Sequence, residues 1–200
     1  MSLDRFLNPR AIAIIGASPE TGKIRGLLLS MLKSNGYEGA LYPINPGHDE
    51  IAGLRCWPSV AAVEKPIDLA LIAIPAEGVP AALEECAAAG IPYAAIISSG
   101  FAEQGGVGDR LQAAIAAIVR RTGIRVCGPN AEGFHNEIAR VAATFSPTVE
   151  LKPGVIPWNA GGGRVGVIAQ SGGMGFSFYN RGRALGLAFS QIISTGNEVD

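Results

Sequence analysis

The stretch AIAIIGAS at residues 11–18 decides the fold class of this 200-residue chain. Its five leading apolar residues run without a break and stop at Gly16. Four later runs are largely apolar and are followed closely by Gly, Pro, Asn or Ser: residues 40–44, 67–74, 93–97 and 124–127. Short runs without a polar face are typical of strands in a parallel sheet that is covered on both sides.

Helical patterns separate most of these runs, and a glycine follows each of them. They span residues 23–35, 79–89 and 109–122. The alternation predicts an α/β protein with a doubly wound, Rossmann-like parallel sheet and right-handed crossovers. Ligands bind beyond the carboxyl ends of the strands in such sheets, so we expect the segments that follow the strands to meet at one crevice.

The pattern breaks between residues 146 and 163, where Pro and Gly recur, and this segment is predicted to be a linker. A strand at 164–169, a turn at 171–173, a helix at 174–187 and a strand at 189–194 are predicted to follow. Two strands and a helix rarely bury enough surface to be stable alone. We therefore expect a first domain at 1–145 and, at 164–200, the incomplete start of a second α/β domain that docks on further chain or on another subunit.

Composition and charge exclude several classes of protein. The chain is 48% hydrophobic and 16% charged, with a formal net charge of -1, which excludes a disordered protein and gives no basic footprint for nucleic acid. Its apolar runs are far shorter than the roughly 18 residues that cross a membrane, and no signal-peptide core is present, so a cytoplasmic protein is expected. Three widely spaced cysteines and two histidines suggest neither a disulfide framework nor a metal site.

The turn after the first strand, GASPETGKIRG at residues 16–26, is expected to face a phosphate group, because it leads to the amino terminus of a helix. It does not match the dinucleotide fingerprint, since Ser18 and Thr21 stand where the second and third glycines belong. The second strand also lacks an acidic residue at its end, and no Walker loop is present. Ser18, Lys23, Arg25 and His48 instead favour a phosphate-rich ligand that is not a simple dinucleotide, and NAD is the second choice.

Six short motifs, in order along the chain, resemble the NDP-forming acyl-CoA synthetases, which include ADP-forming acetate-CoA ligase and the alpha subunit of succinyl-CoA synthetase. The motifs are IIGAS at 14–18, YPINP at 42–46, IAIPAE at 72–77, ISSGF at 97–101, GPN at 128–130 and AQSGG at 169–173. Each motif is weak alone, but the set in register makes the resemblance specific.

The resemblance implies that residues 1–145 are a Rossmann-like CoA-binding domain and that residues 164–200 begin a flavodoxin-like ligase domain. It also implies where the ligands bind. It assigns the coenzyme A (CoA) contacts to Gly16, Ser18, Lys23, Asn45, His48, Pro75, Ile97, Ser98, Ser99 and Asn130, and the phosphate and acyl-substrate contacts to Ser171, Gly172, Gly173 and Phe176. His48 departs from the family, where Lys or Arg is common, and an imidazole is only partly charged near neutral pH. Ala131 and Glu132 also depart, where Cys-Leu or Cys-Pro is common.

The reaction that the resemblance implies converts acid, CoA and ATP or GTP to acyl-CoA, nucleoside diphosphate and phosphate, through a phosphohistidine. The histidine, the Mg-nucleotide site and the ATP-grasp domain or subunit are expected outside these residues, so no catalytic residue is assigned and the chain is expected to be inactive alone. An oligomer is expected. A stand-alone CoA-binding or regulatory module and a nicotinamide-dependent oxidoreductase are the alternatives.

Overall fold

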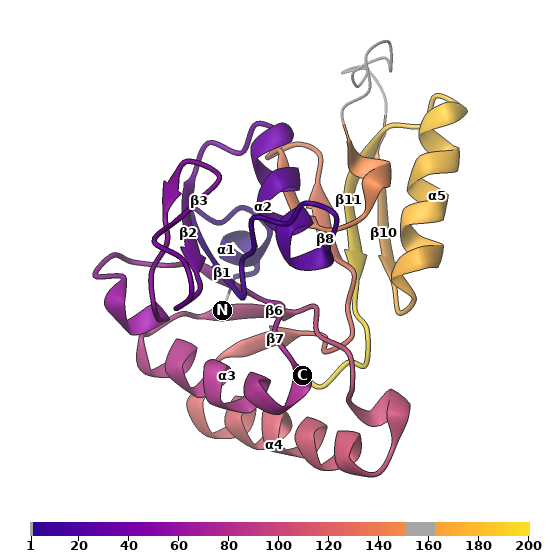
Figure 1. Cartoon of the computed structure of the whole chain (residues 1–200). Coiled ribbons are helices and arrows are strands. Elements are labelled where there is room, and N and C mark those ends of the chain that lie inside the picture. Colours follow the sequence, from indigo (N-terminus) through magenta and orange to yellow (C-terminus); the bar gives the residue numbers. More distant parts are fainter. Residues whose placement is uncertain (1, 151–162) are drawn as a thin grey trace.

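The computed structural model describes residues 2–150 and 163–200. Five parallel strands form the first sheet, in the order β2-β1-β5-β6-β7 (Figure 1). They are β1 (Ala11–Ile15), β2 (Ala40–Ile44), β5 (Leu69–Ile72), β6 (Tyr93–Ile96) and β7 (Arg125–Cys127). The predicted fold class is confirmed, and each strand lies within or next to one of the apolar runs.

Helices cover both faces of this sheet, as β1 shows residue by residue. Ile12 and Ile14 pack into the core beneath helix α2 (Ile24–Ser34). Ala13 and Ile15 point the other way, into the opposite core. Helices α3 (Val79–Ala88) and α4 (Val107–Thr122) cover that face, on the other side of the sheet from α2 (Figure 1). All the residues of β1 are buried, because alternate side chains enter opposite cores. The three predicted helices are confirmed.

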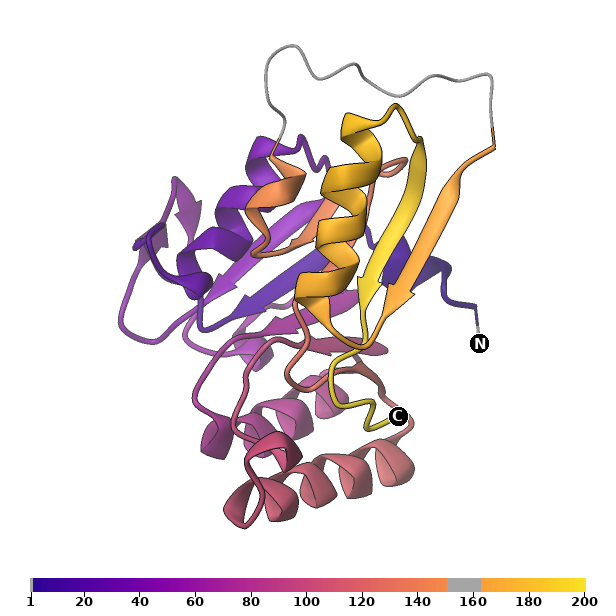
Figure 2. The same ribbon diagram turned by 90° about the vertical axis from the view of Figure 1, so that its right-hand side faces the viewer.

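A second sheet has the strand order β10-β11-β8-β9 (Figure 2). Its strands are β8 (Gly133–Asn136), β9 (Val141–Thr144), β10 (Val165–Ala169) and β11 (Phe189–Ser194), and helix α5 (Gly172–Ala184) covers one face. Residues 164–200 are called the second unit below. Their two strands, β10 and β11, were predicted, and their helix begins at Gly172 rather than at Met174. The hairpin β8–β9 was not predicted; it pairs antiparallel with β11 and also packs under α2.

The remaining elements are short: α1 (Asp4–Leu7), β3 (Glu50–Ile51), β4 (Leu54–Arg55), and the 3-10 turns η1 (Val60–Ala62), η2 (Ala76–Gly78), η3 (Ala102–Gln104) and η4 (Pro147–Val149). Residues 151–162 of the predicted linker lie outside the described residues. In the part of the chain that the structure describes, no helix is long and apolar enough to cross a membrane.

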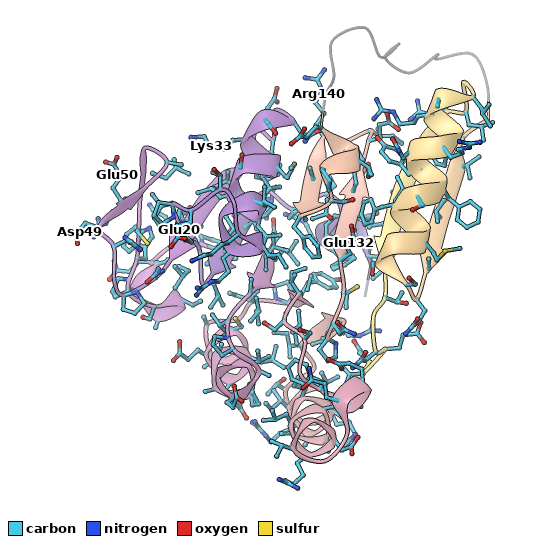
Figure 3. All side chains as sticks on the ribbon, turned by 45° about the vertical axis from the view of Figure 1, so that its right-hand side comes forward. Glu20, Lys33, Asp49, Glu50, Glu132 and Arg140 are labelled. Carbon is cyan, nitrogen blue, oxygen red and sulfur yellow. The ribbon has the colours of Figure 1, made fainter. Side chains whose placement is uncertain are left out.

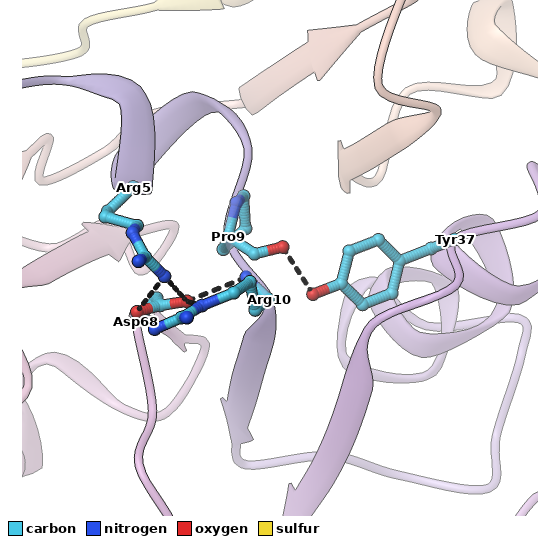
Figure 4. Close-up of polar contacts among 5 residues, drawn as sticks. All are labelled: Arg5, Pro9, Arg10, Tyr37 and Asp68. Carbon is cyan, nitrogen blue, oxygen red and sulfur yellow. Dashed lines mark hydrogen bonds and ion pairs between the residues drawn. The ribbon is translucent and has the colours of Figure 1, made fainter.

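An ionic cluster closes the amino edge of the first sheet (Figure 4). The Asp68 carboxylate accepts the backbone N–H of Arg10 at 2.8 Å and forms an ion pair with Arg5 at 3.2 Å. Burial would raise the pKa of Asp68, but the hydrogen bonds from Arg10 and the charges of both arginines outweigh it and hold the pKa below its ordinary value. Nearby, the Tyr37 hydroxyl donates to the Pro9 carbonyl at 2.9 Å. These contacts fasten the chain entering β1 and leave the opposite edge for the loops that follow the strands.

Large apolar side chains are exposed on the outer side of the second unit. They belong to β10, α5 and the turn after α5: Val165, Ile168, Met174, Phe178, Leu185 and Leu187. Ile168, for example, is 75% exposed on an edge strand. Soluble proteins seldom leave such a patch bare, so this side is suited to contact with further protein.

Candidate ligand site at the carboxyl edge of the first sheet

The loop after β1 passes so close to β5 that only glycine fits at its first position. Gly16 has a φ of +87°, and a Cβ there would lie 2.5 Å from the Ala73 carbonyl oxygen. Gly26, in the first turn of α2, allows an equally close approach, since a Cβ would lie 2.2 Å from the Glu20 carbonyl oxygen. These two glycines hold the loop against the sheet and the helix.

The charged residues of this loop face solvent, and Ser18 is half-buried. The Ser18 hydroxyl accepts the Glu20 backbone N–H at 3.2 Å, and the Lys23 ammonium pairs with the Glu20 carboxylate at 2.6 Å. Lys23 lowers the pKa of Glu20 through this hydrogen bond and its charge. Lys23 is the N-cap residue of α2 and is 60% exposed, and Arg25 is exposed beside it, so both cations are accessible to an anionic ligand.

Asn45 and Ser98 connect neighbouring loops. The Asn45 amide donates to the Ala17 carbonyl at 2.8 Å and accepts the Gly47 N–H at 2.9 Å, which joins the loops after β1 and β2. The Ser98 hydroxyl donates to the Ile74 carbonyl at 2.6 Å and accepts the Ile74 N–H at 3.1 Å, which joins the loops after β5 and β6. Both side chains were predicted to contact CoA, and in the structure their hydrogen bonds shape the edge that a ligand would meet.

The other predicted contacts on these loops lie at the surface or in the core. His48, after β2, and Pro75, after β5, are exposed, as is Ser99. Ile97 is 6% exposed and continues the buried end of β6. The loops after β2, β1, β5 and β6 therefore form one continuous edge, as the topology predicted.

A cavity of about 380 Å³ lies where this edge meets the second unit. Five of the predicted site residues line it: Ile97, Ser99, Asn130, Ser171 and Gly172. The other lining residues are Ile24, Ala131, Glu132, Phe145, Gln170 and Gly196. A separate cavity of about 610 Å³ lies over α2, where Ser18 lines it together with Thr21 and Lys33.

Residues from the second unit complete this region. Ser171 is the N-cap of α5, and its hydroxyl accepts the Met174 N–H at 3.4 Å. Asn130, with a φ of +57°, donates from its amide to the Asn197 side chain at 3.3 Å. Gly173 is exposed beside Ser171. Phe176 is 1% exposed and packs with Tyr179 and Phe189 in the core under α5, so its acyl contact stays a prediction.

Two carboxylates that received no binding role from the sequence are part of this region. Glu103 accepts the N–H groups of Gly100 and Phe101, and also the Asn197 amide at 2.5 Å. Burial would raise the pKa of Glu103, but these hydrogen bonds outweigh it and lower the pKa. Glu132, labelled in Figure 3, lines the cavity. Burial raises its pKa, and a hydrogen bond from Ser146 opposes the rise. Its one signal in the sequence was the departure from the common motif after Asn130.

The fold and the site together define a doubly wound α/β protein whose ligand site lies along the carboxyl edge of a parallel sheet and departs from the dinucleotide fingerprint. A more particular assignment comes from comparison with known families. The chain belongs to the CoA binding domain family, whose model matches residues 10–137. The model of the succinyl-CoA ligase like flavodoxin domain matches residues 162–200. The resemblance stated from the motifs is confirmed.

The relatives carry the same two regions in longer chains. The chain is 36% identical to the alpha subunit of ADP-forming acetate-CoA ligase I of Pyrococcus furiosus, over all of this chain and 42% of that one. It is 34% identical to ADP-forming acetate-CoA ligase I of Archaeoglobus fulgidus, over 98% of this chain and 27% of that one. Among solved structures, the dinucleotide forming acetyl-coenzyme A synthetase 1 of Ca. Korarchaeum cryptofilum, in complex with phosphate and ADP, has a TM-score of 0.88 at 36% identity, over all of this chain and 40% of that one.

Proposed function

We propose that this chain is the CoA-binding part of an ADP-forming acid-CoA ligase. The chain spans roughly a quarter to two fifths of the length of the curated relatives named above. The names of these relatives give the reaction class, which joins a carboxylic acid to CoA with formation of ADP. The Mg-nucleotide, the phosphohistidine and an ATP-grasp domain or subunit belong, in this proposal, to the rest of the enzyme, and the exposed apolar side of the second unit supports contact with it.

The observation that carries the proposal is the distribution of charge along the carboxyl edge. Lys23, Arg25 and His48 lie on the loop and helix after β1 and on the turn after β2. The opposite end, after β6 and β7, offers hydroxyl and amide groups and the cavity of about 380 Å³. The phosphates of CoA fit the first region, and its uncharged pantetheine arm fits the second.

The dimensions agree with such an extended ligand. β1 and β7 are three strand spacings apart in the order β1-β5-β6-β7, which is about 14 Å at the usual separation of neighbouring strands. A ligand with its phosphates beside α2 would cross the ends of β5 and β6 and present its thiol end to the cavity. Ser99 and Asn130 line that cavity and would meet the end of the arm.

A calorimetric titration of the whole chain with CoA tests this proposal, with dephospho-CoA and NAD as comparison ligands. We expect saturable CoA binding, and a loss of about tenfold in affinity for Lys23→Ala, because a charge-assisted contact with phosphate would be removed. Lys65→Ala is the matched control, since Lys65 is an exposed lysine that precedes β5 at the opposite edge. Clear NAD binding without CoA binding would revive the oxidoreductase alternative and overturn the proposal.

The role of His48 has its own test in the same titration. His48→Ala is expected to weaken CoA binding, because it removes a hydrogen-bonding group from the turn after β2. Unchanged CoA affinity in the variant would remove His48 from the site.

A further inference from the structure

Glu132 stands out among the residues of the cavity after β6 and β7. Within the described part of the chain, it is the single ionisable residue of the cavity lining. The apolar part of the lining comes from Ile24, Ile97 and Phe145, and the polar part from uncharged hydroxyl and amide groups. One carboxyl group therefore sets the electrostatic character of an otherwise neutral chamber.

The structure holds Glu132 in place from several sides. Its backbone N–H donates to the Ser194 hydroxyl at 3.0 Å, and its carbonyl accepts the Thr144 hydroxyl at 2.7 Å. Its side chain lies against Gly172 at the start of α5, where a Cβ would approach the Glu132 Cβ to 2.3 Å and one carboxyl oxygen to 2.5 Å. The missing side chain at Gly172 makes the space that the carboxyl group occupies.

Among the described residues, no cation contributes to the pKa shift of the Glu132 carboxyl group. Burial is the main influence on its pKa, and the Ser146 hydroxyl is the other. An ionised Glu132 therefore repels a second anionic group that enters the cavity. Solvent and salt screen this repulsion only weakly, because the site is half-buried.

We propose that Glu132 is a specificity-determining residue, which excludes acyl groups that carry a second carboxylate and admits neutral acyl groups. The inference rests on the proposed function, which brings the thiol end of CoA to this cavity. An acyl group on that thiol continues into the chamber toward Glu132. A neutral aliphatic chain meets the apolar lining, whereas a terminal carboxylate meets a like charge.

The test compares acyl-CoA thioesters that have nearly the same length and different terminal charge. Butyryl-CoA ends in a methyl group, succinyl-CoA in a carboxylate and β-alanyl-CoA in an ammonium group. Calorimetry on the whole chain is expected to show succinyl-CoA binding at least about tenfold more weakly than butyryl-CoA, and β-alanyl-CoA binding no more weakly than butyryl-CoA. CoA itself serves as the reference for the shared part of the ligand.

The variant Glu132→Gln keeps the shape of the side chain and removes its charge. It is expected to bring succinyl-CoA to within about twofold of butyryl-CoA, with unchanged affinity for CoA. Glu64→Gln, at an exposed carboxylate that precedes β5, is the matched control and is expected to keep the wild-type gap. A purely structural role of Glu132 would change the affinity for all ligands together.

Each outcome decides the question. Equal affinity of the wild-type chain for all three thioesters would overturn the inference, and this result needs no variant. A gap that persists in a folded Glu132→Gln chain would also overturn it, while CoA binding would leave the proposed function intact. Failure of every CoA species to bind would remove the proposed function and the inference with it.

Discussion

Buried His135 is expected to make the stability of the chain fall in mild acid. The residue lies on β8, is 3% exposed, and packs edge-on against the Tyr179 ring with centroids 5.6 Å apart. Burial lowers its pKa from 6.5 to about 4; the positive charge of Arg183 on α5 adds to this, and a hydrogen bond with the Val141 backbone opposes it. Glu137, the residue after β8, lies within the influence of the same Arg183.

The direction of the effect follows from which state binds the proton. The unfolded chain takes up a proton on this imidazole as the pH falls through 6.5, while the folded chain resists until about 4. The contribution of neutral His135 to the free energy of unfolding is therefore fully present above pH 6.5 and is lost progressively between pH 6.5 and 4. With ~1.4 kcal/mol for each pH unit between the two pKa values, the complete loss is about 3 kcal/mol, and about 2 kcal/mol is already lost at pH 5.

Urea unfolding followed by circular dichroism at pH 8, 6 and 5 measures this loss. His135→Phe keeps a ring against Tyr179 and cannot take up a proton. Between pH 8 and pH 5, we expect the free energy of unfolding of the wild-type chain to fall by about 2 kcal/mol more than that of His135→Phe. This comparison cancels the titration of the carboxylates that both chains share. The other histidine, exposed His48, supplies the control variant His48→Ala. Parallel stability curves for the wild-type chain and His135→Phe would refute the reasoning.

Three further predictions concern other parts of the molecule. Gly16→Ala is expected to cost about 3 kcal/mol in a thermal unfolding experiment, because the new Cβ would collide with the Ala73 carbonyl at a φ of +87°; an unchanged melting temperature would contradict this packing. Asp68→Asn is expected to cost only about 1 kcal/mol at pH 7, since both arginine partners are partly exposed. Because the folded pKa of Asp68 is lowered, that cost is expected to vanish as the pH falls through it, and a cost that persists in strong acid would count against the ion pairs. Burial raises the pKa of the Cys86 thiol to about 12 and, with the charge of Glu198, that of Cys127 to about 11, so neither is expected to react with iodoacetamide at pH 8 before unfolding. Rapid alkylation of the native chain, followed by mass spectrometry, would show that these thiols are accessible.

The first sheet could be predicted from the sequence because its signals are local. An apolar run that stops at Gly16 marks a strand and its end, and five such runs with helices between them leave few alternative topologies. The hairpin β8–β9 gives no such signal. Its first strand contains His135 and Asn136, which are 3% and 5% exposed, and only tertiary contacts explain their burial: the Tyr179 ring against His135 and the Leu7 carbonyl that accepts the Asn136 amide at 2.9 Å.

The candidate site divides in the same way. Topology alone brings the loops after the strands to one edge, so the region was predictable. The role of each side chain was not predictable. Asn45 and Ser98 show this, because they donate hydrogen bonds to backbone carbonyl groups of neighbouring loops. The position of Glu132 depends on the absent side chain of Gly172, forty residues later in the chain, and no local pattern reports such a contact.

The junction between the two units gives the cavity its walls, and it also couples them. After β11 the chain returns to β7, where the Asn197 N–H donates to the Pro129 carbonyl at 2.8 Å and the Cys127 thiol donates to the Ser194 carbonyl at 3.2 Å. A ligand that extends from Lys23 to this cavity would touch the first unit along its whole edge and the second at Ser171. Binding energy gained by the folded state alone stabilises every element that the ligand contacts. CoA is therefore expected to slow amide hydrogen exchange in α5 and β11 as well as in the loop after β1, and protection confined to the first unit would show that the ligand stops short of the junction.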